Sequence, residues 1–420
     1  MKLSDAAAVY AEKISDEKIR AMFIQCFMST FETTVQLEDD GSCFVITGDI
    51  PAMWLRDSSA QVNHYIPFAK ESEEAFKVIS GLIARQTDCI LYDAYANAFN
   101  REANGKGHQK DKTEMSPLVW ERKYEIDSLC YPVKLIYRFW KEADTTEHFT
   151  DKMQKAFYRI IELWTVEQRH ENSPYYFRRP FKRKSDTLSY KGKGAPVSYT
   201  GMTWSGFRPS DDSCVYGYLV PANMFAVVAL GYISEIAEEI YKDSVLKEKA
   251  EKLRSEIIEG IEKYAIVKDS YGKSFYAYET DGRGNYNLMD DANVPSLLSL
   301  PYLGYCSADD ELYRNTRSFI LSKANPYYFE GKTAKGIGSP HTPKDHIWPI
   351  ALSMQGLTSD SKDEMLSIIR TLAQTNADTG FMHESFHKDK PEKFTRVWFS
   401  WANTLFAELI IKYLSEGGEI

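Results

Sequence analysis

The sequence predicts an all-α fold, an α/α toroid in which six inner helices are ringed by six outer ones. Apolar residues recur along most of the 420 residues at the three- and four-residue spacing of amphipathic helices. Long segments rich in Gly, Pro and aromatic residues fall mostly at every second junction between predicted helices, so we expect these loops to gather on one face. An open helical solenoid is the alternative, and it loses support because no repeat of about 34 or 40 residues is visible.

Each predicted helix follows from its own apolar stripe. In the first, over residues 6–33, the side chains of Ile19, Met22, Phe23 and Cys26 share one face. The other helices are expected at about 58–69, 73–87, 125–142, 147–170, 219–241, 245–265, 290–300, 310–322, 345–357, 361–376 and 400–416.

Long loops are expected between these helices, and their tryptophans and tyrosines make them too apolar for disorder. No change in composition marks a domain boundary, so residues 1–420 are predicted to form a single domain. The loops cover about 98–123, 171–218, 269–289, 323–344 and 377–399, and short strand-like pieces at about 43–47, 187–190 and 274–278 would form minor β-hairpins on the loop face.

Composition and charge exclude several classes of partner. The net charge of −9 and the isoelectric point of about 5.6 argue against nucleic acid and anionic membrane surfaces. No membrane span is expected, because no apolar run approaches the roughly 20 residues that a span needs. The N-terminal segment lacks the apolar core of a signal peptide, and the six cysteines show no C-x-x-C spacing. We therefore expect reduced thiols and a cytoplasmic location, and find no signal for an oligomeric state.

The densest motif covers residues 48–62, GDIPAMWLRDSSAQV. Its Asp-Ser-Ser at 57–59 predicts a helix N-cap. Trp54, Arg56 and Asp57 together favour a pocket for a polyhydroxylated ring, because an indole covers the apolar face of a sugar and a charged pair binds its hydroxyl groups. A buried structural ion pair is the alternative interpretation of Arg56 and Asp57.

A second motif covers residues 206–213, GFRPSDDS. A capping turn would explain the adjacent carboxylates Asp211 and Asp212. The functional interpretation is a general acid, because adjacent carboxylates point in different directions. One can then donate a proton while the other orients the substrate or holds Arg208.

A third motif covers residues 380–387, GFMHESFH, and matches the zinc-protease pattern H-E-x-x-H at His383, Glu384 and His387. That pattern needs a continuous helix, so that both histidines share one face. Gly and Pro residues close on both sides disfavour such a helix. In either interpretation Glu384 is a general base that activates water.

Further polar residues lie in the predicted loops. Asn293 ends the run Asp-Asp-Ala-Asn at 290–293, whose default role is helix capping. His341 and His346 share one loop and helix entrance with Trp348, which favours a pocket wall, although a single histidine is more often structural. Weaker candidates are residues 97–99 and 124–127.

Taken together, the motifs at 48–58, 207–212 and 381–386 resemble glycoside hydrolase family 125, the bacterial and fungal exo-α-1,6-mannosidases. The three motifs occur in the expected order, and the likeness spans essentially the whole chain. The resemblance implies an (α/α)6 barrel and an inverting hydrolysis that needs no metal or cofactor. It implies non-reducing terminal α-1,6-linked mannose as the substrate, in oligosaccharides such as N-glycan fragments.

The resemblance also implies roles for residues. The acid of the family matches the Asp211-Asp212 pair, of which we favour Asp211, and its base matches Glu384. Another enzyme of this fold (a glucan hydrolase or phosphorylase), a zinc peptidase and a carbohydrate-binding scaffold are the competing hypotheses. The residues expected to bind the sugar are Trp54, Arg56, Asp57, Arg208, Asp212, Asn293, His341 and His346.

Overall fold

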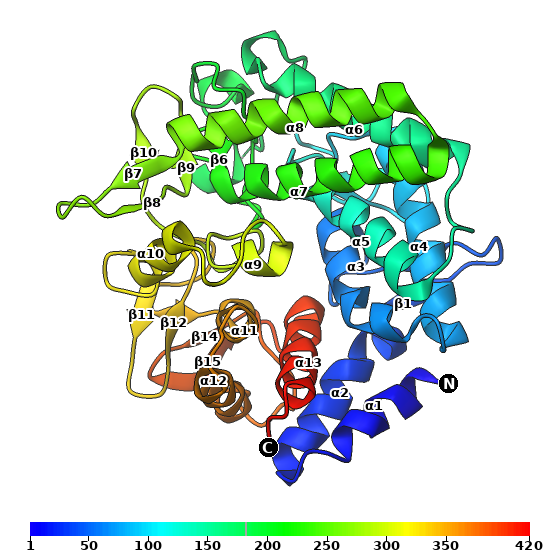
Figure 1. The fold of residues 1–420 in the computed structure, drawn as a ribbon, viewed down its shortest axis with the longest axis vertical. Helices are drawn as coiled ribbons and strands as arrows, with labels where there is room; N and C mark the ends of the chain where they lie inside the picture. The colour runs from blue at the N-terminus through cyan, green and yellow to red at the C-terminus, as the bar shows by residue number, and fades with distance from the viewer. Residues whose placement is uncertain (181–182) are drawn as a thin grey trace.

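The computed structural model describes residues 1–180 and 183–420, and its helices form a ring of two layers (Figure 1). The predicted toroid is confirmed. The inner layer contains α3 (Leu55–Val62), α5 (Asp127–Ala143), α7 (Val220–Ile236), α9 (Leu300–Leu303), α11 (Pro349–Leu357) and α13 (Ser400–Ser415). The outer layer contains α2 (Glu17–Thr33), α4 (Glu73–Tyr92), α6 (Asp151–Glu167), α8 (Ser244–Tyr264), α10 (Glu311–Ile320) and α12 (Lys362–Gln374).

Burial separates the two layers. Outer helix α8 is amphipathic, with Leu246, Leu253 and Ile257 buried on the side that packs against α7. Inner helix α7 is buried along almost its whole length. Together with the π-helical turn Ala237–Tyr241 that follows it, α7 is long and apolar enough to cross a membrane, contrary to the expectation from sequence. In this fold 72% of that apolar window is buried, as expected for a core helix.

The last helix closes the ring. Helix α13 packs against α11 on one side and against α2 and α3 on the other, so the end of the chain meets its beginning. A further helix, α1 (Leu3–Ala11), lies outside the ring against α2. The hydroxyl of Ser15, between α1 and α2, donates a hydrogen bond to the Ile420 carbonyl at 2.6 Å, which ties the last residue to the start of α2 (Figure 1).

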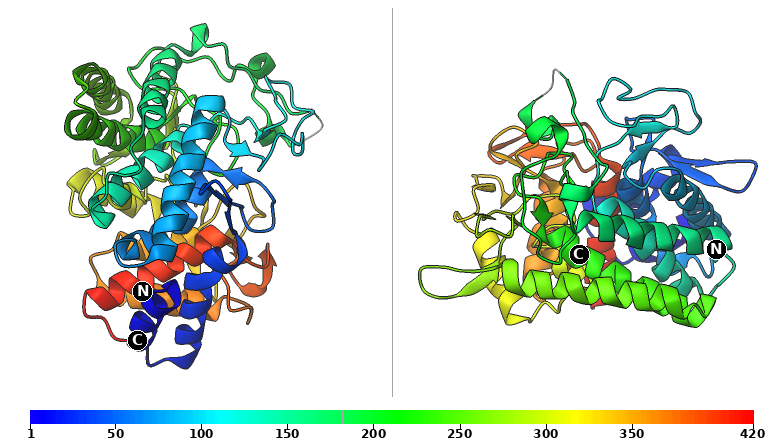
Figure 2. Two further views of the ribbon diagram at one scale, coloured as in Figure 1. Left: turned by 90° about the vertical axis from the view of Figure 1, so that its right-hand side faces the viewer. Right: turned by 90° about the horizontal axis from the view of Figure 1, so that it is seen from above.

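The long loops run from the end of each outer helix to the start of the next inner helix, so they gather at one end of the ring, as predicted (Figure 2). Short strands join neighbouring loops, as where β13 (His346–Ile347) pairs antiparallel with β14 (Ser385–His387). The other strands are β1 (Val35–Leu37), β2 (Cys43–Val45), β3 (Met53–Trp54), β4 (Ala98–Phe99), β5 (Val119–Glu121), β6 (Tyr218–Leu219), β7 (Ile266–Lys268), β8 (Ser274–Tyr276), β9 (Glu279–Thr280), β10 (Tyr286–Asn287), β11 (Tyr328–Glu330), β12 (Lys335–Ile337) and β15 (Lys390–Thr395).

Two predicted helices differ from the structure. The segment 6–33 is two helices, because the Asp16 side chain accepts the backbone N–H of Ile19 and starts α2 afresh. At 290–300 the chain forms turns, and only Leu300–Leu303 is helical. There the Asp290 carboxylate accepts the N–H groups of residues 297 and 298, which an α-helix would bond to its own carbonyls.

Two smaller predictions are also wrong. The helix expected at 58–69 begins at Leu55 with Trp54 as its N-cap, so the Asp-Ser-Ser at 57–59 lies inside it. The Ser58 and Ser59 hydroxyls donate to carbonyls of the preceding turn instead of capping. Residues 187–190 form no strand.

Close packing between α8 and the loop that follows α6 yields a test of the fold. A Cβ atom at Gly260 would lie 2.6 Å from the Thr200 carbonyl oxygen and 3.0 Å from the Met202 nitrogen. We expect Gly260→Ala to lower the free energy of unfolding by about 1–3 kcal/mol in urea titrations. Gly231→Ala in α7 is the matched control, because its Cβ would meet only the Arg254 guanidinium at 3.5 Å. The control should gain up to about 1 kcal/mol, and equal effects of the two changes would contradict this packing.

Candidate active site

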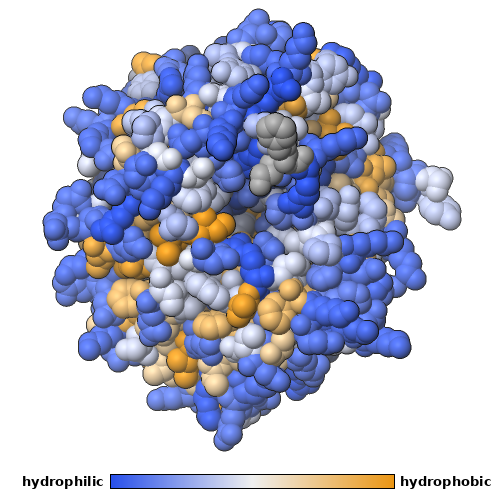
Figure 3. All heavy atoms as spheres, turned by 180° about the vertical axis from the view of Figure 1, so that it is seen from behind, coloured by the Kyte–Doolittle hydropathy of each residue, from blue (hydrophilic) through white to orange (hydrophobic). Residues whose placement is uncertain are grey.

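A central hollow opens where the loops meet at the N-terminal ends of the inner helices (Figure 3). Seven of the ten catalytic and sugar-binding residues predicted from the sequence line it: Trp54, Arg56, Asp57, Asp211, Asn293, His341 and Glu384. The other residues of the lining are Thr47, Ile50, Pro209, Ser210, Trp348, Arg396, Phe399 and Trp401.

Arg56 is the centre of a buried ionic cluster. Its Nη1 atom lies 2.6 Å from Glu125 Oε2 and 3.2 Å from Asp127 Oδ2. Its Nε lies 3.3 Å from Asp57 Oδ2, and its Nη2 lies 3.7 Å from Asp211 Oδ1. Four carboxyl groups therefore surround one guanidinium. Glu125 and Asp127 had been only weak candidates in the sequence.

The cluster changes the protonation of its members. Burial raises the pKa of Asp57 and the pKa of Glu125, because a charged carboxylate loses its water, and the charge of Arg56 only partly opposes this. Burial likewise raises the pKa of Asp127 to about 6. One guanidinium cannot neutralise several carboxylates, so Asp57, Glu125 and Asp127 hold their protons to higher pH than exposed carboxyl groups do.

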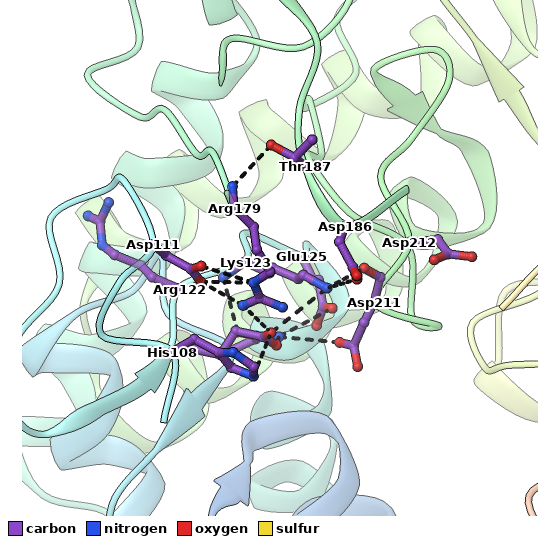
Figure 4. A network of polar contacts seen from close by, with 12 residues as sticks. His108, Asp111, Arg122, Lys123, Glu125, Arg179, Asp186, Thr187, Asp211 and Asp212 are labelled. Atoms are coloured by element: carbon purple, nitrogen blue, oxygen red, sulfur yellow. Dashed lines mark hydrogen bonds and ion pairs between the residues drawn. The ribbon is translucent and has the colours of Figure 1, made fainter. Parts of the chain in front are cut away.

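Asp211 sits at the tip of a tight turn. Its backbone has a φ of +66°, in the left-handed region, and its N–H donates to the Arg208 carbonyl at 2.9 Å. The ammonium group of buried Lys123 donates to the Asp211 carbonyl at 2.6 Å, which fixes the tip in place (Figure 4). The carboxyl group is 30% exposed, so it can reach a molecule in the hollow.

Asp212 points away from Asp211, and its carboxylate is buried (Figure 4). Its Oδ1 lies 3.4 Å from His341 Nδ1. Burial alone would raise the pKa of Asp212, but the hydrogen bond and charge of His341 outweigh it and hold that pKa below its usual value. Burial would lower the pKa of His341, but Asp212, with the charges of Asp211 and Glu384, raises it. Asp212 and His341 are therefore an ion pair in which each group favours the charged form of the other.

Glu384 enters the hollow from the opposite loop, directly before β14. Its Oε1 lies 3.6 Å from Arg396 Nη1, and its side chain is 14% exposed. Arg396 also bonds the Asp49 carboxylate and donates to the Thr47 carbonyl at 3.3 Å. The guanidinium lies 4.6 Å from the centre of the Phe399 ring. These contacts tie the Glu384 loop to the first motif of the chain.

The H-E-x-x-H pattern does not lie on a helix. Residues 385–387 form strand β14, and His383 is buried with its Nδ1 2.7 Å from the Val397 carbonyl and its ring stacked on Phe394 at 3.8 Å. The two histidines therefore do not share a helical face, which is what a zinc peptidase of this kind requires. Over residues 1–180 and 183–420, no group of three His, Cys, Asp or Glu side chains is placed to hold a metal ion.

Five residues of the lining carry a buried donor that finds no hydrogen-bond partner among the described residues. Arg56 Nε, one of these donors, lies 3.3 Å from the Asp57 carboxylate as an ion pair. The other four are Thr47 Oγ1, Trp54 Nε1, Asn293 Nδ2 and Arg396 Nε. An unsatisfied buried donor costs about 1–3 kcal/mol, so several at one hollow indicate that a polar ligand completes them. Oxygen atoms of sugar hydroxyl groups are acceptors of the required kind.

Arg208 and His346 lie outside the lining. Arg208 Nε donates to Glu279 Oε1 at 2.6 Å, and Glu279 also accepts the backbone N–H groups of Val215 and Tyr216. Arg208 thus anchors the loop that carries Asp211. His346 Nδ1 lies 3.1 Å from the Lys344 carbonyl, in β13. Direct contact of Arg208, Asp212 or His346 with a sugar stays a prediction.

Sequence reasoning missed Phe399 and Trp401, which line the hollow at the start of α13. Trp54 and Trp348 occupy the N-cap positions of α3 and α11. A shared signal was available, because each of these aromatic residues stands at the start of a predicted inner helix. Their rings supply the apolar walls of the hollow.

An α/α toroid whose loop face holds separate carboxyl groups, aromatic walls and unpaired donors in one hollow has the features expected of a glycoside hydrolase. Residues 16–411 match the family described as metal-independent alpha-mannosidase (GH125). The chain belongs to this family, and it is a glycoside hydrolase.

The chain is also similar to proteins of known sequence or structure. A solved Streptococcus pneumoniae structure, described as a metal-independent alpha mannosidase in a non-productive complex with alpha-1,6-mannobiose, is 50% identical with a TM-score of 0.96 over 98% of this chain and 97% of that one. The "Meiotically up-regulated gene 157 protein" of Schizosaccharomyces pombe is 38% identical over 96% of this chain and 84% of its own length. A glucoamylase from Saccharomycopsis fibuligera, 11% identical with a TM-score of 0.58 over 100% of this chain and 95% of that one, shares the fold.

The ion pair between His341 and Asp212 makes stability depend on pH. His341 has its pKa raised above the ordinary 6.5, so its contribution is complete below 6.5 and is lost as pH rises through the higher folded value. Asp212 has its pKa lowered below the ordinary 3.8, so its contribution is lost only as pH falls through that lower value. We expect His341→Gln to destabilise the protein more at about pH 6 than at about pH 9. Urea titrations at both pH values measure this, and an equal loss at the two would contradict the pairing.

Proposed function

We propose that the protein is an inverting exo-α-mannosidase that releases non-reducing terminal α-1,6-linked mannose from oligosaccharides. The observation that carries this proposal is that Asp211 and Glu384, 173 positions apart in the sequence, line the same hollow. The α-1,6 linkage is supported by the mannobiose bound to the 50% identical relative. Fragments of N-glycans are one source of such chain ends.

The hydrolysis is a single displacement. Protonated Asp211 gives its proton to the glycosidic oxygen as the bond to the anomeric carbon breaks. Ionised Glu384 takes a proton from a water molecule that attacks this carbon from the opposite face. In inverting glycosidases the two carboxyl groups stand about 6.5–9.5 Å apart, which leaves room for that water.

The hollow binds the terminal ring. Trp54, Trp348 and Trp401 cover its apolar C–H surfaces, while the unpaired donors of Trp54, Asn293 and Arg396 bond its hydroxyl oxygens. Because walls surround the ring, the polymer can enter only by its end, which gives exo action. The fold itself does not choose the sugar, since the glucoamylase shares it. A panel of terminal α-1,6-, α-1,2- and α-1,3-mannosides and glucosides separates the proposal from a glucan hydrolase or phosphorylase.

A cytoplasmic location is part of the proposal. All six cysteines are free thiols, and Cys26, Cys43, Cys89 and Cys130 are buried. This is typical of a reducing compartment.

Replacing either proposed catalytic carboxyl should abolish most turnover of α-1,6-mannobiose. We expect Asp211→Asn and Glu384→Gln each to lower kcat by about 10²–10⁴-fold, the usual contribution of a general acid or base. A mannoside whose leaving group needs no proton, such as a dinitrophenyl mannoside, should restore the rate of Asp211→Asn but not that of Glu384→Gln. Released mannose and leaving group are measured directly.

Asp212→Asn is the comparison that distinguishes the two adjacent aspartates. Because Asp212 pairs with His341, replacing its carboxylate by an amide should lower the rate of turnover. The rate should still depend on the leaving group as it does in the wild type. Loss of turnover in Asp212→Asn, with rescue by the dinitrophenyl substrate, would assign the acid to Asp212 instead. Full activity of Asp211→Asn on mannobiose would overturn the mechanism.

A further inference from the structure

Glu125 and Asp211 approach each other through shared donors. The side-chain amide of Asn97 lies 3.4 Å from Glu125 Oε1 and 3.4 Å from Asp211 Oδ1. The Arg56 guanidinium likewise reaches Glu125 Oε2 at 2.6 Å and Asp211 Oδ1 at 3.7 Å. Two carboxyl groups therefore flank the same two donors.

The two members of this pair differ in their access to water. Glu125 is buried, and its other oxygen accepts bonds from Arg56 and from the Ser128 hydroxyl at 2.8 Å. The side chain of Asp211 is 30% exposed, and it lines the hollow. A second negative charge in such a pair is costly because like charges at close range repel in a poorly hydrated site. Burial and the charge of Asp211 raise the pKa of Glu125 well above its usual value, although Arg56 opposes them.

Other charges also face Asp211. Arg56 and Asp57 lie on α3, and Asp127 lies at the start of α5. His341 and Glu384 face Asp211 across the hollow. Below the turn lie Lys123, which bonds the Asp211 carbonyl, and Glu121, which accepts the Asn97 amide at 3.0 Å. Two cations, Lys123 and Arg179, surround Glu121 and hold its pKa at about 2, despite burial. Of the carboxylates around Asp211, Glu125 is the one that shares both the Asn97 amide and the Arg56 guanidinium with it.

We propose that Glu125 is a positioning residue that shares one proton with Asp211 and so keeps the general acid protonated at neutral pH. This inference rests on the proposed function, in which Asp211 is the acid. In each turnover Asp211 transfers the proton to the glycosidic oxygen and the pair becomes doubly negative. The pair then takes up one proton from solvent through the exposed Asp211, while Glu384 releases to solvent the proton that it took from water.

The test is the pH dependence of kcat/KM for α-1,6-mannobiose. Glu125→Gln removes the like charge and offers an amide that favours the ionised form of Asp211. We expect the alkaline limb of the profile to move to lower pH by about one unit or more, which lowers kcat/KM on that limb about tenfold. Binding of mannose, measured at the pH optimum by calorimetry, should change little. A merely structural role would lower activity at all pH values without moving the limb.

Two variants control this experiment. Asp127→Asn removes an equal charge from the same Arg56 Nη1, which lies 3.2 Å from the Asp127 carboxylate. Asp127 does not share the Asn97 amide with Asp211. This variant should therefore move the alkaline limb less than Glu125→Gln does. Glu125→Asp keeps the charge one methylene further back and should place the limb between those of the wild type and Glu125→Gln. Thermal unfolding reports whether Glu125→Gln folds. If it does not, the pH profile of Glu125→Asp still tests the proposal.

The outcomes separate the two proposals. If the wild type releases no mannose, the proposed function fails. If the wild type is active but the alkaline limb stays in place in Glu125→Gln and Glu125→Asp, only the role of Glu125 fails. The same holds if Asp127→Asn moves the limb as far as Glu125→Gln does.

Discussion

The guanidinium of Arg56 lies within 3.7 Å of four carboxyl groups: Asp57 on its own helix, Glu125 and Asp127 at the start of α5, and Asp211 on the turn before α7. A buried charge without partners is costly, so these segments must meet at this point for the cation to be stable. The contact therefore fixes the ends of two inner helices and the position of the proposed acid together. Catalytic geometry and fold stability depend on the same ion cluster.

The inner helices all begin at the loop face, and this arrangement explains why the site lies there. Their N-terminal ends carry unpaired backbone N–H groups and a partial positive charge, which favours carboxylates. Trp54, Trp348 and Phe399 stand at the N-caps of α3, α11 and α13, so the same helix ends supply the apolar walls. The loops then place Asp211 and Glu384 above these helix ends.

The ring of helices could be predicted because its apolar stripes repeat at helical spacing, and the three motifs could be recognised because each is dense in charged and aromatic residues. The partners of Arg56 could not be predicted, because Glu125 lies 69 positions away in the sequence and only the fold brings the two residues together. The turns at 291–299 also escaped prediction, because the Asp290 carboxylate replaces helical hydrogen bonds there. The different environments of Asp211 and Asp212 depend on His341, which comes from a distant loop.

The most direct measurement of the central claim, that one acid and one base act across a hollow wide enough for a water molecule, is the anomeric form of the first mannose released. Proton NMR during early hydrolysis of α-1,6-mannobiose distinguishes the two anomers before they interconvert. β-Mannose should accumulate first, because water attacks opposite the breaking bond. Initial release of α-mannose would contradict the claim, because it requires a covalent intermediate and carboxyl groups too close together for that water.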